Sequence, residues 1–375
     1  MGMADIATVL FKDFLKFDPK DPGWIDRDRF VLSNGHGSML LYACLYLTGY
    51  QNIKLEDIKN FRQLGSPTAG HPEYNEILGI ETTTGPLAQG LANAVGMALA
   101  EKILSSRFGN EIINHYTYVF AGDGCLMEGL SHEACSFAGH LNLSKLIVFF
   151  DDNSISIDGP TNLSTSDDHI TRFQSYNWAT ISINGHNHNE IFRAITRAKQ
   201  NNRPTLIACK TKIGFGSPNK ESTASAHGSP LGGEEIQLIR KRLNWSFNPF
   251  EIPNNLMKEW ESFALRSQDI KKLWENNVSK IKKNEIFETY FNYKISSEFT
   301  EEIEKLKLHH SNNKTYCATR KSSQIALDII TPIIENLIGG SADLTGSNNT
   351  KTKSLDTLNK DNYSGRYIYY GVREH

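Results

Sequence analysis

The sequence is poor in cysteine, in unbalanced charge and in long apolar runs. Its five cysteines are an odd number without the paired spacing of a zinc or disulfide framework, so we expect a reducing, cytoplasmic setting. The 40 basic and 42 acidic residues leave a net charge of −2, which argues against nucleic acid as a partner. No apolar run is long enough to span a membrane, and the first five residues lead into an amphipathic helix over residues 6–14 rather than a signal peptide.

Apolar, strand-like runs alternate with helical patterns along most of the chain. Strands are expected at residues 30–33, 116–121, 146–150, 178–183 and 205–209, with helices between them that include residues 38–47 and 128–141. A later helix is expected at residues 322–337, interrupted by Pro332. This alternation predicts an α/β fold with a parallel sheet flanked by helices on both faces. We expect a first domain over residues 1–285, with a helical linker from about 238. Residues 286–375 are expected to hold a further linker and the incomplete start of a second, similar domain.

The most specific pattern lies at the ends of two neighbouring predicted strands. Gly122-Asp123-Gly124 follows one strand and Asn153 follows the next, thirty positions after Asp123. One carboxylate, one amide oxygen and the carbonyl of Ile155 suit Mg²⁺, and two coordination positions would remain for a diphosphate. An ordinary Gly-Asp-Gly turn beside an unrelated loop is the alternative, but the flanking strands favour the metal site. Cys125 is interpreted as a small packed residue rather than a nucleophile.

Three histidines lie in loops rich in glycine or proline: His36, His71 and His227. A single histidine is usually structural, whereas three in such loops indicate a site. Imidazoles donate hydrogen bonds to phosphate and hydroxyl groups and move protons near neutral pH.

Three side chains in the last fifth of the sequence could bind a phosphate or act as an acid. Arg320 and Ser347 could bind a phosphate, although each alone would suggest an ordinary surface residue. Glu374 follows an apolar strand pattern, where a buried carboxylate would have a raised pKa and could act as an acid.

Together these motifs resemble the transketolases, a family that uses thiamine diphosphate. The matching stretches follow the family order over nearly the whole chain, at residues 28–38, 81–87, 122–129, 151–159, 213–220, 340–344 and 371–374. The resemblance implies the thiamine diphosphate-binding fold. Residues 1–285 would then form the diphosphate-binding domain, and 286–375 the linker and truncated start of the pyrimidine-binding domain.

The resemblance also assigns roles to matching positions. Mg²⁺, Ca²⁺ or Mn²⁺ would be bound by Asp123, Asn153 and the carbonyl of Ile155. Thiamine diphosphate would lie against His36, Gly85, Leu87, Gly124, Asn153, His227, Asp343 and Glu374. The sugar phosphate would contact His71, His227, Arg320 and Ser347. Catalysis would fall to Glu374, His227 and His71, with Glu374 hydrogen-bonded to the aminopyrimidine ring.

The activity that the resemblance implies is ketol transfer in the pentose phosphate pathway. A two-carbon unit would pass from a ketose phosphate such as xylulose 5-phosphate to an aldose phosphate such as ribose 5-phosphate, through a thiamine diphosphate ylid. The full-length enzyme would be a homodimer, with Glu128 at its interface. Family members begin earlier and continue beyond Glu374, so the chain is expected to be a fragment that is inactive alone. The alternatives are a dihydroxyacetone synthase-like enzyme and a non-catalytic cofactor-binding piece of a split or truncated enzyme.

Overall fold

The computed structural model describes residues 1–74, 76–281, 287, 290–291, 296–314 and 316–374. The chain divides into two compact units. Unit 1 consists of Met1–Glu101 and Ile113–Lys271, and unit 2 of Lys102–Ile112 and Lys272–His375. The domain boundary expected at 285/286 involves residues outside the described ones. No helix in the described ranges is both long and apolar enough to cross a membrane.

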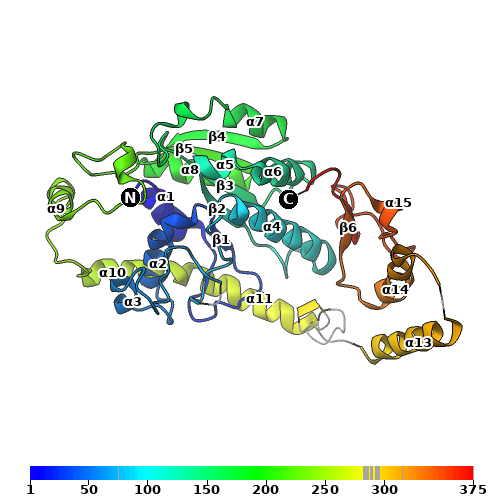
Figure 1. Cartoon of the computed structure of the whole chain (residues 1–375). Helices are drawn as coiled ribbons and strands as arrows, with labels where there is room; N and C mark the ends of the chain where they lie inside the picture. The colour runs from blue at the N-terminus through cyan, green and yellow to red at the C-terminus, as the bar shows by residue number, and fades with distance from the viewer. Residues whose placement is uncertain (75, 282–286, 288–289, 292–295, 315, 375) are drawn as a thin grey trace. The chain divides into compact units, whose positions relative to one another are not determined.

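Short helices and parallel strands alternate through most of the chain (Figure 1). The strands are β1 (Arg29–Leu32), β2 (Thr117–Gly122), β3 (Leu146–Asp152), β4 (Ala179–Asn184), β5 (Thr205–Lys210), β6 (Gly339–Ser341) and β7 (Tyr367–Tyr369). The α-helices are α1 (Ala4–Val9), α2 (Ser38–Leu47), α3 (Leu55–Lys59), α4 (Gln89–Phe108), α5 (Asp123–Met127), α6 (Gly129–His140), α7 (His169–Ser175), α8 (His188–Lys199), α9 (Gly233–Arg242), α10 (Asn254–Ser262), α11 (Gln268–Ile281), α13 (Ser297–Asn313), α14 (Thr319–Ile333) and α15 (Thr345–Asn348). Shorter helical turns are η1 (Leu10–Phe14), a π-helix, and the 3₁₀ turns η2 (Gly35–Gly37), η3 (Thr161–Leu163), η4 (Ala224–Ala226) and η5 (Phe263–Ser267).

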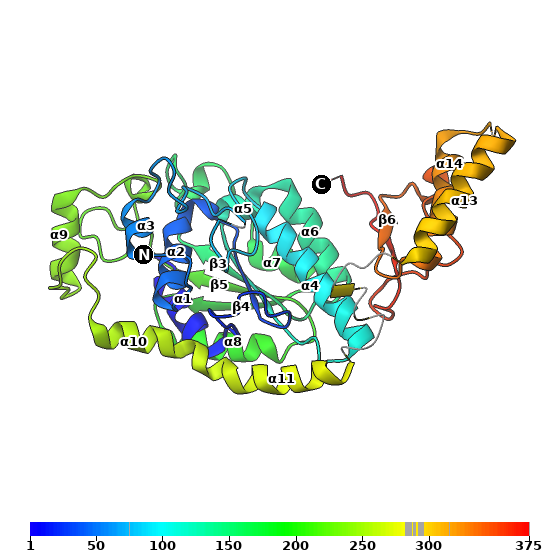
Figure 2. The ribbon, with the colours of Figure 1, turned by 90° about the horizontal axis from the view of Figure 1, so that it is seen from below.

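Unit 1 is built on a five-stranded sheet of order β1-β2-β3-β5-β4, in which every neighbouring pair is parallel (Figure 2). Strands β2, β3 and β5 are buried along their whole length except at the last residue. Continuous burial of this kind requires cover on both faces, since an antiparallel sheet with one wet face would alternate. The expected parallel sheet flanked by helices is confirmed.

Aromatic side chains lock one face of this sheet against the N-terminal helices. Phe120 of β2 lies between Phe30 of β1 and Phe149 of β3, with ring centroids 4.8 and 5.2 Å apart. Phe11 of η1 packs on Phe30 at 5.4 Å. All four rings are buried, and each contributes roughly 1.5–3 kcal/mol through burial. The loops that leave β1, β2 and β3 therefore start from a rigid frame.

The helix expected at residues 128–141 is present as α6 (Gly129–His140), and a short helix that was not expected precedes it. A short helix, α5, begins at Asp123 directly after β2, and Glu128 then takes an extended conformation (φ −65°, ψ 139°) before α6 begins. Helix α7 was not expected from the pattern, because only His169 and Phe173 of its seven residues are buried. Its start is fixed instead by a cap, in which Asp168 accepts a hydrogen bond from the backbone N–H of Thr171.

Unit 2 contains its own small parallel pair, β6 with β7. Helix α14 precedes β6 and contains Pro332 one residue before its end, as the sequence pattern suggested. Arg366 ties the unit together, because its guanidinium donates to the carbonyls of Ile334 and Thr331, both at 2.8 Å. In the described part of this unit, α14 is followed by β6, α15 and β7.

Candidate functional site

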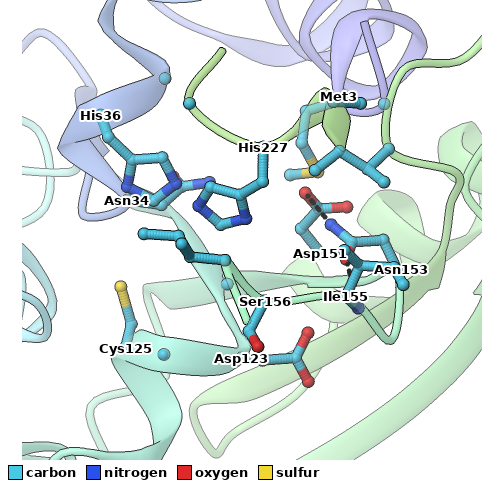
Figure 3. Close-up of a pocket in the computed structure, with 18 of the residues that line it drawn as sticks. Met3, Asn34, His36, Asp123, Cys125, Asp151, Asn153, Ile155, Ser156 and His227 are labelled. Carbon is cyan, nitrogen blue, oxygen red and sulfur yellow. Dashed lines mark hydrogen bonds between the residues drawn. The ribbon is translucent and has the colours of Figure 1, made fainter. Parts of the chain in front are cut away.

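A cavity of about 770 Å³ opens in unit 1 where strands of the sheet end. Its walls come from the segments that follow β1, β2 and β3, and from the loops before and after η4 (Figure 3). Ligand crevices in parallel α/β sheets form at this edge because all the strand carboxyl ends meet there. Nine residues singled out in the sequence line this one cavity: His36, His71, Gly85, Leu87, Gly124, Asp123, Asn153, Ile155 and His227.

The candidate metal ligands follow paired strand ends, as predicted. Gly122 lies opposite Asp151 in the β2–β3 ladder, so Asp123 and Asn153 emerge side by side. Ser154 then takes a left-handed φ of 62°, and the side-chain Oδ1 of Asn153 accepts the backbone N–H of Ile155 at 3.0 Å. This Asx-type turn keeps Asn153 and Ile155 on the same short loop beside Asp123 (Figure 3).

The carboxyl group of Asp123, on the cavity wall, has a strongly raised pKa. Burial, together with the neighbouring carboxylates of Asp152 and Asp151, raises its pKa from 3.8 to about 7. The site is therefore short of positive charge, and a divalent cation would relieve the repulsion. No cluster of three or more His, Cys, Asp or Glu in the described ranges could hold a metal by itself. The wall accordingly suits a cation that takes few protein ligands and completes its shell with phosphate oxygens and water.

Asp151 and Thr211 belong to the site, and neither was assigned a role from the sequence. The buried carboxylate of Asp151 accepts the hydroxyl of Thr211 and the Nδ2 of Asn153, the latter at 3.1 Å. Burial raises the pKa of Asp151, and these two hydrogen bonds oppose the rise. Asp151 could have been suspected, because a carboxylate at the end of an apolar strand needs partners. Nothing in the sequence marks Thr211, which follows a different strand.

Two of the three loop histidines stack against each other. The rings of His36 and His227 lie 5.0 Å apart and 17° from parallel. Burial, together with the neighbouring His227 and His71, lowers the pKa of His36 to about 4. Burial also lowers the pKa of His227, against the opposing effect of Asp151. Both imidazoles are therefore neutral at pH 7, so each ring offers one donor and one acceptor.

A tight contact between two loops brings the third histidine to the cavity. A Cβ at Gly35 would lie 2.5 Å from Oγ1 of Thr84, so only glycine allows the His36 loop to approach the segment before Gly85. Gly85 in turn lies against the ring of His71, which would be 3.5 Å from a Cβ at that position. Close packing therefore requires glycine at position 35, whereas a Cβ at position 85 would make only an ordinary contact with His71.

Four predicted site residues belong to unit 2 and do not line this cavity: Asp343, Arg320, Ser347 and Glu374. All four are exposed. Asp343 follows β6 with a left-handed φ of 61°, whereas Arg320 and Ser347 lie on α14 and α15. The expectation that Glu374 is buried at a strand end is wrong for this chain, because β7 ends at Tyr369 and the residues after it leave the sheet.

A smaller cavity of about 410 Å³ shares Asp123 with the main one. Asp152 lines it and is paired with Lys210, whose Nζ lies 3.1 Å from Oδ1 of Asp152. Successive residues of a strand point to opposite faces of the sheet. Asp151 therefore lines the main cavity and Asp152 the smaller one, and Asp123 lines both. His169, unnoticed in the sequence, is a buried wall residue of the smaller cavity.

Comparison with family models gives two matches that together span most of the chain. Residues 1–298 match the model described as transketolase, thiamine diphosphate binding domain. Residues 315–375 match the model described as transketolase, pyrimidine binding domain.

Relatives and solved structures agree with these models. The chain is 53% identical to a transketolase of Buchnera aphidicola (subsp. Acyrthosiphon pisum) and 48% identical to transketolase 1 of Escherichia coli, and it is covered completely in both comparisons. Its fold matches a transketolase from Leishmania mexicana with a TM-score of 0.91 at 40% identity, covering 100% of this chain and 57% of that one. A Pichia stipitis transketolase in complex with sedoheptulose 7-phosphate matches with the same score and coverage at 41% identity. The chain spans 57% and 58% of the length of the two curated relatives.

Proposed function

The chain belongs to the transketolase family, and on this premise we propose that its cavity binds the diphosphate of thiamine diphosphate through a divalent metal ion. We further propose that the protein transfers a two-carbon ketol unit between sugar phosphates, as a cytoplasmic homodimer of the pentose phosphate pathway. The matching Pichia stipitis transketolase, solved with sedoheptulose 7-phosphate, supports sugar phosphates as substrates. The single observation that carries the proposal is that Asp123, Asn153 and Ile155 lie together on the wall of the large cavity, at the ends of two paired strands.

The metal would be held by the carboxylate of Asp123, the side-chain oxygen of Asn153 and the backbone carbonyl of Ile155. This set contains one charge and three oxygen atoms, which suits Mg²⁺ completed by diphosphate oxygens and water. Gly124, next to Asp123, lines the cavity without a side chain, so the diphosphate can approach the backbone there.

Unpartnered polar atoms support a polar ligand in the same cavity. Among the described residues, Oδ1 of Asn34 and Nδ1 of His227 are buried side-chain atoms without a hydrogen-bond partner, and both residues line the cavity. Such groups cost about 1–3 kcal/mol each when nothing satisfies them. A ligand hydroxyl could donate to Oδ1 of Asn34, and a ligand hydroxyl or phosphate oxygen could pair with Nδ1 of His227.

Bound thiamine diphosphate would supply the nucleophilic carbon that accepts the two-carbon unit. The neutral imidazoles of His36 and His227, together with the ring of His71, would orient cofactor and sugar hydroxyls and carry protons between them. We propose that Asp343 and Glu374 contact the cofactor, with Glu374 holding the aminopyrimidine ring. We also propose that Arg320 and Ser347 bind the phosphate of the sugar.

Calorimetry of thiamine diphosphate binding, with Mg²⁺ and with a chelator, tests the proposed cofactor site. Asp123→Ala should abolish the metal-dependent part of the binding, because it removes the only charged ligand. Asp158→Ala is the matched control, since Asp158 lies on the rim of the same cavity but is exposed and outside the ligand set. Unchanged metal-dependent binding by Asp123→Ala would refute the assignment.

A further inference from the structure

Asn153 can serve a metal only if its amide is turned the right way. The two ends of an asparagine amide differ chemically, since the oxygen can bind a cation and the NH₂ group cannot. Which end faces the cavity is decided by the hydrogen bonds around it. This inference rests on the proposed metal site and concerns what orients its amide ligand.

The hydrogen bonds of Asn153 allow only one orientation of its side-chain amide. Its Nδ2 donates to Oδ2 of Asp151 at 3.1 Å, and its Oδ1 accepts the N–H of Ile155 at 3.0 Å (Figure 3). A carboxylate accepts hydrogen bonds, so Asp151 attracts the NH₂ end and leaves the oxygen toward the loop of Ile155. An oxygen that accepts one hydrogen bond keeps a second lone pair for a cation.

The carboxylate of Asp151 is itself held by a hydrogen bond from the loop after β5. The hydroxyl of Thr211, at the start of the loop after β5, donates to the other carboxylate oxygen of Asp151. The backbone N–H of Thr211 also bonds the carbonyl of Asp152 at 3.2 Å, and Thr211 is buried. The chain of contacts therefore runs from the β5 end through Thr211 and Asp151 to Asn153.

We propose that Asp151, held by Thr211, is a positioning residue that turns the amide oxygen of Asn153 toward the metal. Groups that orient metal ligands typically change metal affinity by about 10–100-fold when they are removed. In this arrangement each oxygen of Asp151 accepts one hydrogen bond, from Thr211 or from Asn153, and we assign Asp151 the role of holding the Asn153 amide rather than that of a metal ligand.

The test is Mn²⁺ binding to the 375-residue chain, followed by electron paramagnetic resonance in the presence of thiamine diphosphate. Asp151→Asn keeps the volume but can present either end of its own amide to Asn153. It should weaken Mn²⁺ binding by about 10–100-fold with an unchanged melting temperature in chelator. Asp152→Asn is the matched control: it removes the adjacent charge, but Asp152 pairs with Lys210 rather than Asn153, so its effect should be clearly smaller.

A swap variant separates orientation from charge. In Asp151→Asn with Asn153→Asp, residue 153 presents an oxygen at either end and needs no orienting partner, while the total charge is unchanged. The swap should recover most of the lost Mn²⁺ affinity. Thr211→Val, which retains the carboxylate but loosens it, should give a smaller loss and serves if Asp151→Asn does not fold.

Other results would contradict either the positioning role of Asp151 or the metal site itself. A swap that binds no better than Asp151→Asn, or wild-type affinity in both Asp151→Asn and Thr211→Val, would overturn the positioning role. If Asp151→Asn binds as poorly as Asp123→Asn and Thr211→Val binds normally, Asp151 is a direct ligand and the proposal is wrong. If Asp123→Asn binds Mn²⁺ normally, the proposed metal site itself fails, and the role of Asp151 falls with it.

Discussion

Replacing Asp123 by asparagine should stabilise the metal-free protein above pH 7. Burial and two neighbouring carboxylates raise the pKa of Asp123 from 3.8 to about 7. Between these values the folded state keeps a proton that the unfolded state has lost, so wild-type stability falls as pH rises through this window and stays low above it. At 1.36 kcal/mol per pH unit the full cost is about 4 kcal/mol, and solvent screening reduces the expected gain in Asp123→Asn to about half of that.

Urea unfolding in chelator measures this effect through tryptophan fluorescence, to which the buried Trp24 and Trp178 contribute. The difference in unfolding free energy between Asp123→Asn and wild type should be about 2 kcal/mol at pH 8 and smaller at pH 5. Asp158→Asn, at an exposed position on the same cavity, should show no such pH-dependent gain. Equal behaviour of the two variants, or a loss of stability in Asp123→Asn at pH 8, would contradict the electrostatic account.

Three further predictions concern packing, acid stability and turnover. Gly139→Ala should lower the free energy of unfolding in urea by about 1–3 kcal/mol, because the new Cβ would lie 1.8 Å from the carbonyl oxygen of Tyr176. Gly96→Ala, in open space on α4, should instead raise it by about 0.5–1 kcal/mol. Similar effects of the two substitutions would refute the packing argument. Burial lowers the pKa of His115 to about 3 despite its hydrogen bond to Asp26, so stability is lost as pH falls from about 6.5 towards 3. His115→Gln should reduce that slope by up to about 1.4 kcal/mol per pH unit, and an unchanged acid titration would count against it. The 375-residue chain with Mg²⁺ and thiamine diphosphate should show negligible ketol transfer from xylulose 5-phosphate to ribose 5-phosphate or formaldehyde, and robust turnover with either acceptor would disprove this.

Local patterns predicted the elements of unit 1 well wherever apolar residues dominate a run. Helix α2 begins and ends at the predicted residues, and β2, β3 and β5 lie within two residues of their predicted positions. The pattern failed where tertiary contacts replace periodicity. It missed the five-residue α5, which begins directly after β2, and the short α7, which is defined mainly by its cap at Asp168.

The sequence by itself determined that Asp123 and Asn153 follow strands, because a run of apolar residues marks a buried strand without reference to the rest of the chain. It also carried the motifs by which the family was recognised. Only the tertiary structure placed Thr211 behind Asp151 and stacked His36 on His227. These pairs lie 60 and 191 positions apart, and no local pattern encodes which strand ends meet. The raised pKa of Asp123 likewise arises from burial and from carboxylates on a neighbouring strand, which exist as neighbours only once the sheet has formed.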